Sequence, residues 1–139
     1  MRDRTVMRLL KKTYPTIYDD LTQKAALTDL CQIETLLDKF CAAKNIQRSD
    51  VYKNRDQSRM LFITIITKAY DPMFFIDEDK QLMKELRRTL AAALFCHDTQ
   101  ISHILSTVKT YLKVYRWFRE DTAKFYAIII NNTTNESCN

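Results

Sequence analysis

The sequence contains no glycine among its 139 residues, where average usage would give roughly ten. Glycine supplies the positive φ of tight hairpins and lets the backbone approach a phosphate closely. Its absence excludes the P-loop, the dinucleotide-binding fingerprint and the serine nucleophile elbow, which all need glycine. Nucleotide-driven chemistry is therefore not expected, and the elements should be helices joined by ordinary loops.

Metal-binding and disulfide motifs are also missing. The four cysteines form no Cys-x-x-Cys pair, and Cys31, Cys41 and Cys96 fall in apolar helical patterns that predict small core side chains. Cys96 lies close in sequence to His97 and His103, but this spacing is not a usual zinc arrangement. We predict a non-enzymatic protein with no catalytic residues, no metal and no cofactor.

Long apolar runs are absent as well. The first residues, "MRDRTVMRLLKKTYPTIY", carry charges throughout and lack the apolar centre of a signal peptide. The longest apolar runs elsewhere are too short to span a bilayer. These features predict a protein of the reducing cytoplasm with no membrane partner.

Apolar and basic residues are present in quantity. The chain is 46% apolar, with 7 Phe, 7 Tyr and 1 Trp, which is enough to bury the core of one domain. Its 22 basic residues against 17 acidic ones give a net charge of +5. This modest excess is compatible with a polyanionic partner.

The spacing of apolar residues predicts a bundle of helices. The segment "MLFITIIT" is β-branched and resembles a strand, but with no glycine and no partner strand it is assigned to a helix. The predicted helices are a basic one at 2–13, one from Thr16 to about Lys44 that stops at Asn45, a turn at 48–54 capped by Ser49, one at 55–70, one at 78–95 capped by Asp77, one at 98–117 and one at 119–130. We divide the chain into an N-terminal helical extension at 1–30, a domain at 31–130 and a polar tail at 131–139.

The helix that begins near Asp98 has two contrasting faces. Its predicted buried face holds Ile101, Ile104, Leu105, Val108 and Leu112, at i, i+3, i+4, i+7 and i+11. Its opposite face carries Thr99, Gln100, His103, Thr107, Thr110 and Lys113. A helix anchored by its back and preceded by another helix across a short turn is the helix-turn-helix arrangement. In that arrangement the first residues of the second helix contact base edges.

Three segments carry a resemblance to a known family. They are "ETLLDKFCAAKNIQRSDVYKNRDQSR", "RMLFITIITKAY" and "TQISHILSTVKTYL", with "FRED" after the last. Together they resemble the C-terminal duplex-DNA-binding domain of the bacterial replication initiator DnaA, a relative of the Trp-repressor fold, over about residues 31–125. The resemblance implies an all-α helix-turn-helix domain of bacterial or phage type that binds duplex DNA in replication or transcription control.

The family's recognition motif is Asp-His-Ser/Thr-Thr-Val-x-His. Matching the hydrophobic register places Ile101 on its Val and His103 on its last His. Thr99 then falls on its Ser/Thr and Gln100 on the Thr that precedes the Val. His97 and Asp98 fall on the motif's first pair as though exchanged. Sliding the match by one residue would put a serine on the buried Val position.

The resemblance also implies basic contacts to DNA. Arg59 would enter the minor groove or hold its phosphates, and Lys53 and Arg55 would flank it. Lys109 and Lys113 are further candidates for phosphate contacts. The chain departs from the family in the turn before the motif, where a family glycine and arginine have no counterpart beside Cys96.

A second interpretation remains open. The chain could be a helical protein–protein interaction module without nucleic-acid binding, with a protein partner on the N-terminal helices. An isolated charge such as Arg59 is ordinarily a solvent-exposed surface residue. A polar helix start is likewise ordinary in a helical bundle that binds no DNA.

Overall fold

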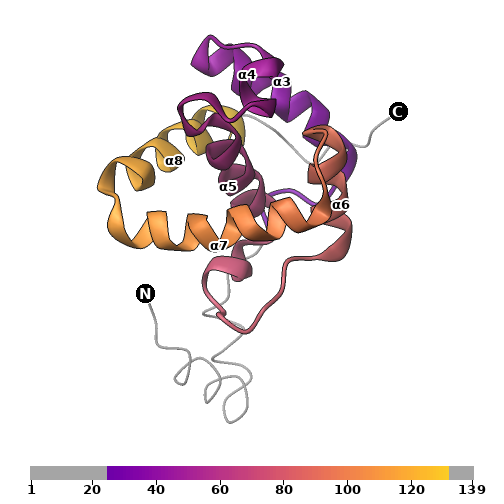
Figure 1. Cartoon of the computed structure of the whole chain (residues 1–139), viewed down its shortest axis with the longest axis vertical. Helices are drawn as coiled ribbons and strands as arrows, with labels where there is room; N and C mark the ends of the chain where they lie inside the picture. Colours follow the sequence, from indigo (N-terminus) through magenta and orange to yellow (C-terminus); the bar gives the residue numbers. More distant parts are fainter. Residues whose placement is uncertain (1–24, 132–139) are drawn as a thin grey trace.

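The computed structural model describes residues 25–131. Over that range it contains six α-helices, three short 3-10 helices and no strand, which confirms the predicted all-α multi-helix bundle (Figure 1). The elements are η1 (Leu30–Gln32), α3 (Ile33–Lys44), α4 (Arg48–Tyr52), η2 (Arg55–Gln57), α5 (Ser58–Tyr70), η3 (Pro72–Phe75), α6 (Lys84–Ala93), α7 (Asp98–Val114) and α8 (Arg116–Ile129). The predicted helix at 2–13 lies outside the described residues.

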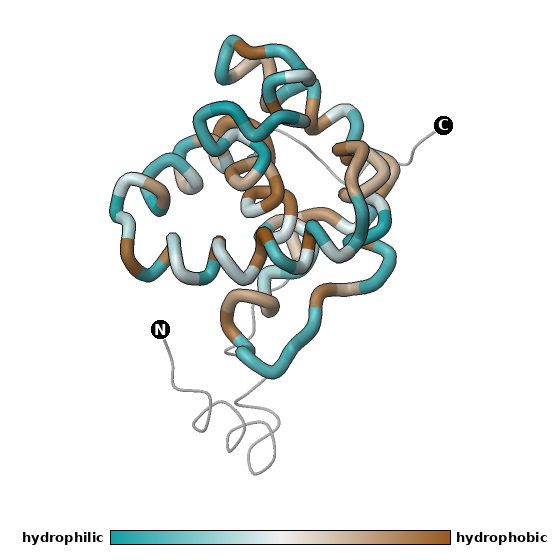
Figure 2. The backbone as a smooth tube through the Cα atoms, in the orientation of Figure 1, coloured by the Kyte–Doolittle hydropathy of each residue, from teal (hydrophilic) through white to brown (hydrophobic). Residues whose placement is uncertain are grey.

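Helix α5 is the centre of the bundle. Every residue from Met60 to Thr67 is buried, and α5 contacts each of the other five α-helices. The β-branched segment is therefore a helix, as predicted, and it is apolar on all sides because it has neighbours on all sides. Figure 2 shows many hydrophobic residues along this helix in the middle of the molecule.

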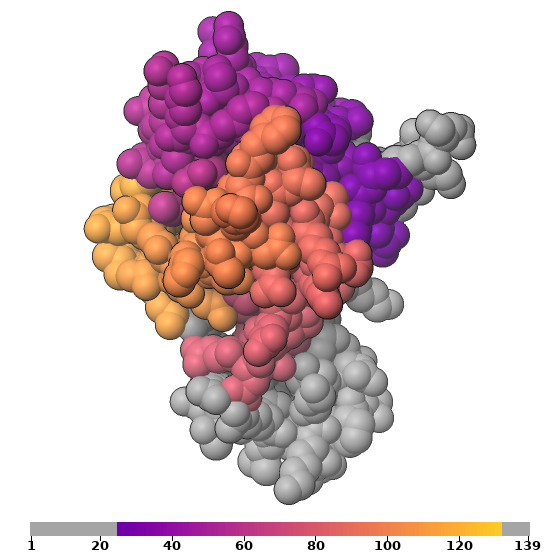
Figure 3. Space-filling model, turned by 45° about the vertical axis from the view of Figure 1, so that its right-hand side comes forward, coloured from indigo at the N-terminus to yellow at the C-terminus, as the bar shows by residue number. Residues whose placement is uncertain are grey.

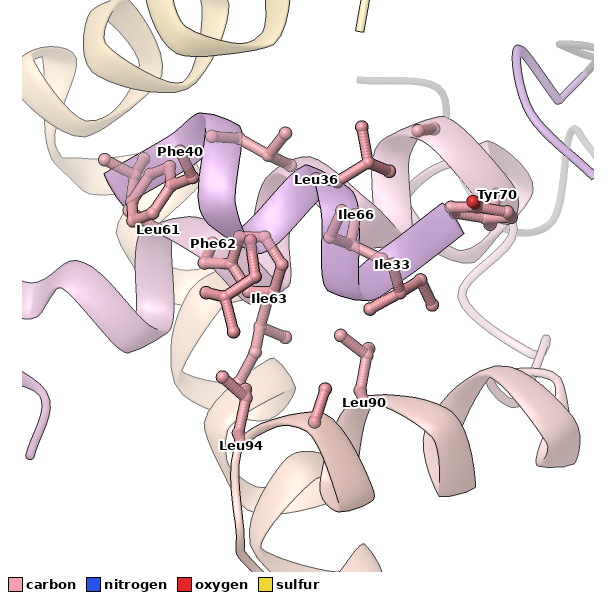
Figure 4. Close-up of a cluster of buried hydrophobic side chains, with 14 of the residues drawn as sticks. Ile33, Leu36, Phe40, Leu61, Phe62, Ile63, Ile66, Tyr70, Leu90 and Leu94 are labelled. Carbon is pink, nitrogen blue, oxygen red and sulfur yellow. The ribbon is translucent and has the colours of Figure 1, made fainter. Parts of the chain in front are cut away.

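The core joins α3 and α6 to α5. The ring of Phe40 on α3 lies 5.4 Å from that of Phe62 on α5 and 6.0 Å from that of Phe125 on α8. Figure 4 shows the aliphatic side chains that fill the remaining space, including Leu90 of α6. Burial of large apolar side chains of this kind is the main favourable term in folding.

The segment before α3 differs from the prediction. Residues 25–29 are not helical, and α3 begins at Ile33 after the short η1, so the predicted helix to Lys44 is interrupted here. Its predicted start at Thr16 lies outside the described residues. Here the N–H groups of Ala26 and Leu27 donate to the carbonyl of Ala69, and the Leu27 side chain is 1% exposed. Leu27, which the prediction placed in the N-terminal extension, therefore packs on the core.

Of two predicted helix ends, the stop of α3 is confirmed and the cap of α4 is wrong. Asn45 adopts a left-handed conformation directly after α3, which confirms it as the stop. The predicted cap at Ser49 is wrong, because Ser49 lies inside α4 and the cap is Gln47, whose N–H donates to Asp50 Oδ2 (3.0 Å). Asp50 thus satisfies one of the donors that every helix start leaves open.

The helix predicted from 78 begins late, at Lys84. The buried Asp71 carboxylate accepts from Lys80 Nζ at 2.6 Å and from the Met83 N–H at 3.2 Å, so it fixes the loop immediately before α6. Asp77 caps no helix. Its carboxylate accepts from the N–H of Asp79 in a local turn, the arrangement that makes Asp a common turn residue.

Candidate nucleic-acid interface

The turn between α6 and α7 spans residues 94–97. The Cys96 N–H donates to the Ala91 carbonyl at 3.0 Å, and the Phe95 N–H points to the Ala92 carbonyl at 3.4 Å. These bonds close the end of α6 in the pattern that usually places a left-handed glycine after a helix. The short turn keeps α7 packed beside α6.

Phe95 occupies that left-handed position. Its φ is 54°, a conformation that costs a residue with a side chain about 1–2 kcal/mol. Its ring is nonetheless 79% exposed. At its other left-handed positions within residues 25–131 the chain uses Asn, Asp or Gln, whereas here the residue is a phenylalanine that faces solvent beside the start of α7.

The first turn of α7 is closed by its own side chains. The Gln100 Oε1 accepts from the His97 N–H at 2.9 Å, and the Gln100 N–H donates to the His97 carbonyl at 3.0 Å. His97 is thus the residue that precedes the helix, as the extended φ of −86° and ψ of 153° confirm. One polar atom of Gln100 is therefore engaged within the protein.

Helix α7 presents the two faces that the sequence predicted. Ile101, Leu105 and Val108 are buried. The residues of the opposite face are all exposed: Thr99, Gln100, His103, Thr107, Thr110 and Lys113. Ile104 and Leu112, predicted as core, are only partly buried, because they lie at the borders of the apolar stripe.

The loop between α4 and α5 carries the predicted basic residues. Asn54 is left-handed, and its Oδ1 accepts from the N–H groups of Arg59 and Met60 at 3.1 and 3.2 Å, which caps the start of α5. Lys53 is exposed. Arg55 is exposed too, and its guanidinium lies 3.3 Å from Asp50, so part of its charge is neutralised.

This loop and the α6–α7 turn meet in space. The rings of Tyr52 and Phe95 stand edge to face with centroids 5.0 Å apart. Arg59 Nη1 points to the Tyr52 carbonyl at 3.4 Å, and its charge lies close enough to Cys96 to oppose the rise that burial causes in the pKa of that thiol. Figure 3 shows the two segments, magenta and orange, side by side on one face.

Two contacts define this junction: the Tyr52–Phe95 ring pair and the approach of Arg59 to Cys96. The predicted site residues adjoin these contacts in the chain: Lys53, Arg55 and Arg59 on one side, and His97, Asp98, Thr99, Gln100 and His103 on the other. Carboxylates lie among them, at Asp50, Asp56 and Asp98. The positive charge of this surface is therefore local, centred on Lys53 and Arg59.

Lys109 and Lys113 lie apart from the junction. Lys109 points to the flank of α7, where its Nζ stands 4.1 Å above the Phe74 ring, and burial lowers its pKa below the usual lysine value. Lys113 is in the last turn, about 21 Å along the axis from Thr99 at 1.5 Å per residue. A ligand that contacts both Thr99 and Lys113 must span this distance.

Tyr52 and Phe95 were not among the site residues predicted from the sequence. An available signal was the lack of glycine: the left-handed residue required after α6 had to be an ordinary one, and Phe95 follows the last apolar residue of that helix. Neither its exposure nor its contact with Tyr52 follows from local sequence, because the two residues are 43 positions apart.

The cysteines match the prediction in part. Cys41 is buried and Cys96 partly so. Cys31, predicted as a core side chain, is exposed and disulfide-bonded, so that prediction is wrong. Residues 25–131 contain no group of three or more His, Cys, Asp or Glu side chains placed to hold a metal ion.

No helix within residues 25–131 combines the length and the apolar character needed to cross a bilayer. Comparison of the chain with protein-family models, with curated proteins and with solved structures found no match.

Proposed function

We propose that this chain is a non-enzymatic protein that binds duplex DNA and reads it with a helix-turn-helix formed by α6 and α7, in the manner of the DnaA and Trp-repressor families. The observation that carries the proposal is the junction of Arg59 and Tyr52 with the start of α7. A helix that reads a groove needs polar side chains at its first turns and cations beside it to hold the phosphates.

The residues divide into two roles in this proposal. Thr99 and His103 are the side chains of α7 that face outward near its start and can meet base edges. Lys53 and Arg59 contact the backbone or the adjacent minor groove. Gln100 has a mixed role, because its carbonyl oxygen already accepts from the His97 N–H while its amide NH₂ can donate to a base.

Salt dependence tests the class of function. Neutralising phosphates releases counterions, so the affinity for a duplex should fall steeply between about 50 and 200 mM salt, with a logarithmic slope of about −2 to −3 for two to three contacts. A gel-shift titration with a random duplex pool measures this slope. No retained duplex at low salt would exclude the proposal.

Paired substitutions distinguish residues that contact bases from residues that contact phosphates. His103→Ala should change the sequence preference by about 1–3 kcal/mol at one or two positions, which sequencing of duplexes selected from a random pool will detect. Lys53→Gln should weaken binding to every duplex and reduce the salt slope by about one unit. Lys124→Gln, on α8 outside the site, serves as the matched control and should bind like the parent.

Gln100→Ala has a distinct expected signature. It should lower stability by about 0.5–1 kcal/mol, because the His97 N–H loses its partner, and it should also relax the sequence preference. If His103→Ala and Gln100→Ala both select the same duplexes as the parent, α7 is not the reading helix.

A second candidate function rests on a separate observation. The corner between α7 and α8 exposes Val114, Tyr115 and Trp117, at 63%, 40% and 45%. Clustered aromatic exposure is typical of protein–protein interfaces. It supports the alternative of an interaction module. The surface predicted for a protein partner was the N-terminal extension at 1–30, of which residues 1–24 lie outside the described part of the chain.

A further inference from the structure

A pocket lies on a different part of the molecule, where α5, α7, α8 and the segment around η3 meet. Its volume is about 310 Å³, at the lower end of the range of small-molecule sites. Its lining consists of Thr64 and Lys68 of α5, Pro72, Phe75 and Ile76 around η3, Leu112 of α7, and Arg119 and Thr122 of α8. The site is separate from the junction of Arg59 with the α6–α7 turn.

Most of this wall is apolar. Pro72, Phe75, Ile76 and Leu112 form a surface that suits an aromatic ring or a short aliphatic chain. Phe75, Ile76 and Leu112 are only partly buried, so a ligand would cover apolar surface that now faces solvent, which is favourable.

Two cations complete the pocket, and both are held in place. Arg119 Nη1 donates to the carbonyls of Leu112 and Lys113 at 2.8 and 3.1 Å, which closes the end of α7 and fixes the guanidinium. Lys68 Nζ stands 4.8 Å above the Tyr126 ring. Within residues 25–131 neither cation forms an ion pair with a carboxylate.

The hydroxyl of Thr122 in the pocket lining also favours a ligand with a polar group. Thr122 is 4% exposed, and its hydroxyl oxygen has no hydrogen-bond partner. Buried polar atoms are nearly always paired with protein, water or ligand. An oxygen brought in by a ligand would supply such a partner.

We propose that this pocket binds a small carboxylic acid with an apolar body, its carboxylate held by Lys68 and Arg119 and its body against Phe75, Ile76 and Leu112. An arginine and a lysine together favour an anion, and the planar guanidinium matches the two oxygens of a carboxylate. The inference does not depend on DNA binding.

The first test compares two probes on the whole 139-residue chain by calorimetric titration. 2-Naphthoate carries the charge and an apolar body, and 2-naphthamide has the same shape without the charge. The naphthoate should bind about tenfold or more tightly, as expected for a hydrogen-bonded charge. Equal affinities, or no naphthoate binding at millimolar concentration, would overturn the proposal without any variant having to fold.

The second test places the ligand. In methyl NMR spectra, naphthoate should shift the signals of Ile76 and Leu112 and leave that of Leu36, in the core, unchanged. Lys68→Met keeps the apolar stem and should weaken naphthoate about tenfold, while Lys84→Met, at the exposed start of α6, should not. Shifts confined to other residues, or a Lys68→Met protein that binds like the parent, would show that this pocket is not the site.

Discussion

Phe95 is the residue at which the shortage of glycine has the clearest structural effect. Its left-handed φ of 54° and its exposed ring both lower the stability of the fold. Its contact with the Tyr52 ring offsets part of this loss. Aromatic pairs of this geometry contribute about 0.5–1.5 kcal/mol. Strained residues of this kind often lie at functional sites, which agrees with the proposed interface.

Two substitutions at this position isolate the strain. Both Phe95→Gly and Phe95→Ala remove the ring, but only glycine tolerates positive φ without cost. The glycine variant should therefore be more stable than the alanine variant by about 1 kcal/mol, measured by urea denaturation. Inside a regular helix the order is reversed, so a more stable alanine variant would show that residue 95 is not left-handed.

Tyr70 provides a second residue-scale prediction. Its side chain is 3% exposed and its hydroxyl donates to the Asp29 carbonyl at 2.6 Å, and burial raises its pKa to about 12, against about 10 for an unfolded chain. The neutral form is thus favoured in the fold. The resulting stability is complete below pH 10 and is lost as the pH rises towards 12.

The unfolding free energy should fall by up to about 2 kcal/mol between pH 9 and pH 12 through this group. Urea denaturation across that range should give a shallower decline for Tyr70→Phe than for the parent, although Tyr70→Phe will be less stable at neutral pH. Tyr115→Phe, at an exposed position, is the matched control. Identical declines in parent and Tyr70→Phe would contradict the assignment.

Among the elements, α7 is the one whose sequence pattern and structure agree most closely. Its apolar stripe predicted three of the residues that are buried, and its polar face is exposed as expected. The two misjudged positions, Ile104 and Leu112, lie at the edges of the stripe. Periodicity identifies the centre of a buried face well, but its width depends on the neighbouring helices.

Substitution of two isoleucines measures that width. Ile101 is fully buried and Ile104 is not, so Ile101→Ala should cost about 2–5 kcal/mol and Ile104→Ala clearly less. Thermal melts of both variants provide the comparison. An equal or larger loss for Ile104→Ala would mean that α7 is rotated from the orientation described.

Helix starts were harder to predict than helix centres. The start of α6 was expected at 78 because Asp77 looked like a cap, yet the buried Asp71 carboxylate holds the loop through Lys80 and Met83. That bond links positions brought together only by the fold. Arg59 could be named as a candidate from its sequence motif. Its approach to the α6–α7 turn could not be predicted, because that contact also joins residues that are distant in sequence.

At the scale of the whole molecule, α5 organises the bundle. Its burial by five other helices follows from its sequence, which is apolar on every side. The all-α class of the chain could therefore be predicted from the sequence. The arrangement of neighbours was not, because an apolar surface has no directional preference. The pocket beside Lys68 and the junction beside Arg59 both lie along this helix, at its two ends.

A helix that is covered on every side in the fold is exposed on every side when the fold opens. The segment from Met60 to Thr67 is β-branched, uncharged and without proline or glycine, which is the composition of aggregation-prone segments. Variants that loosen the bundle should therefore be lost first as insoluble protein during expression, before any change in ligand affinity can be measured. Soluble yield across the core variants, set against their melting temperatures, should fall in the same order.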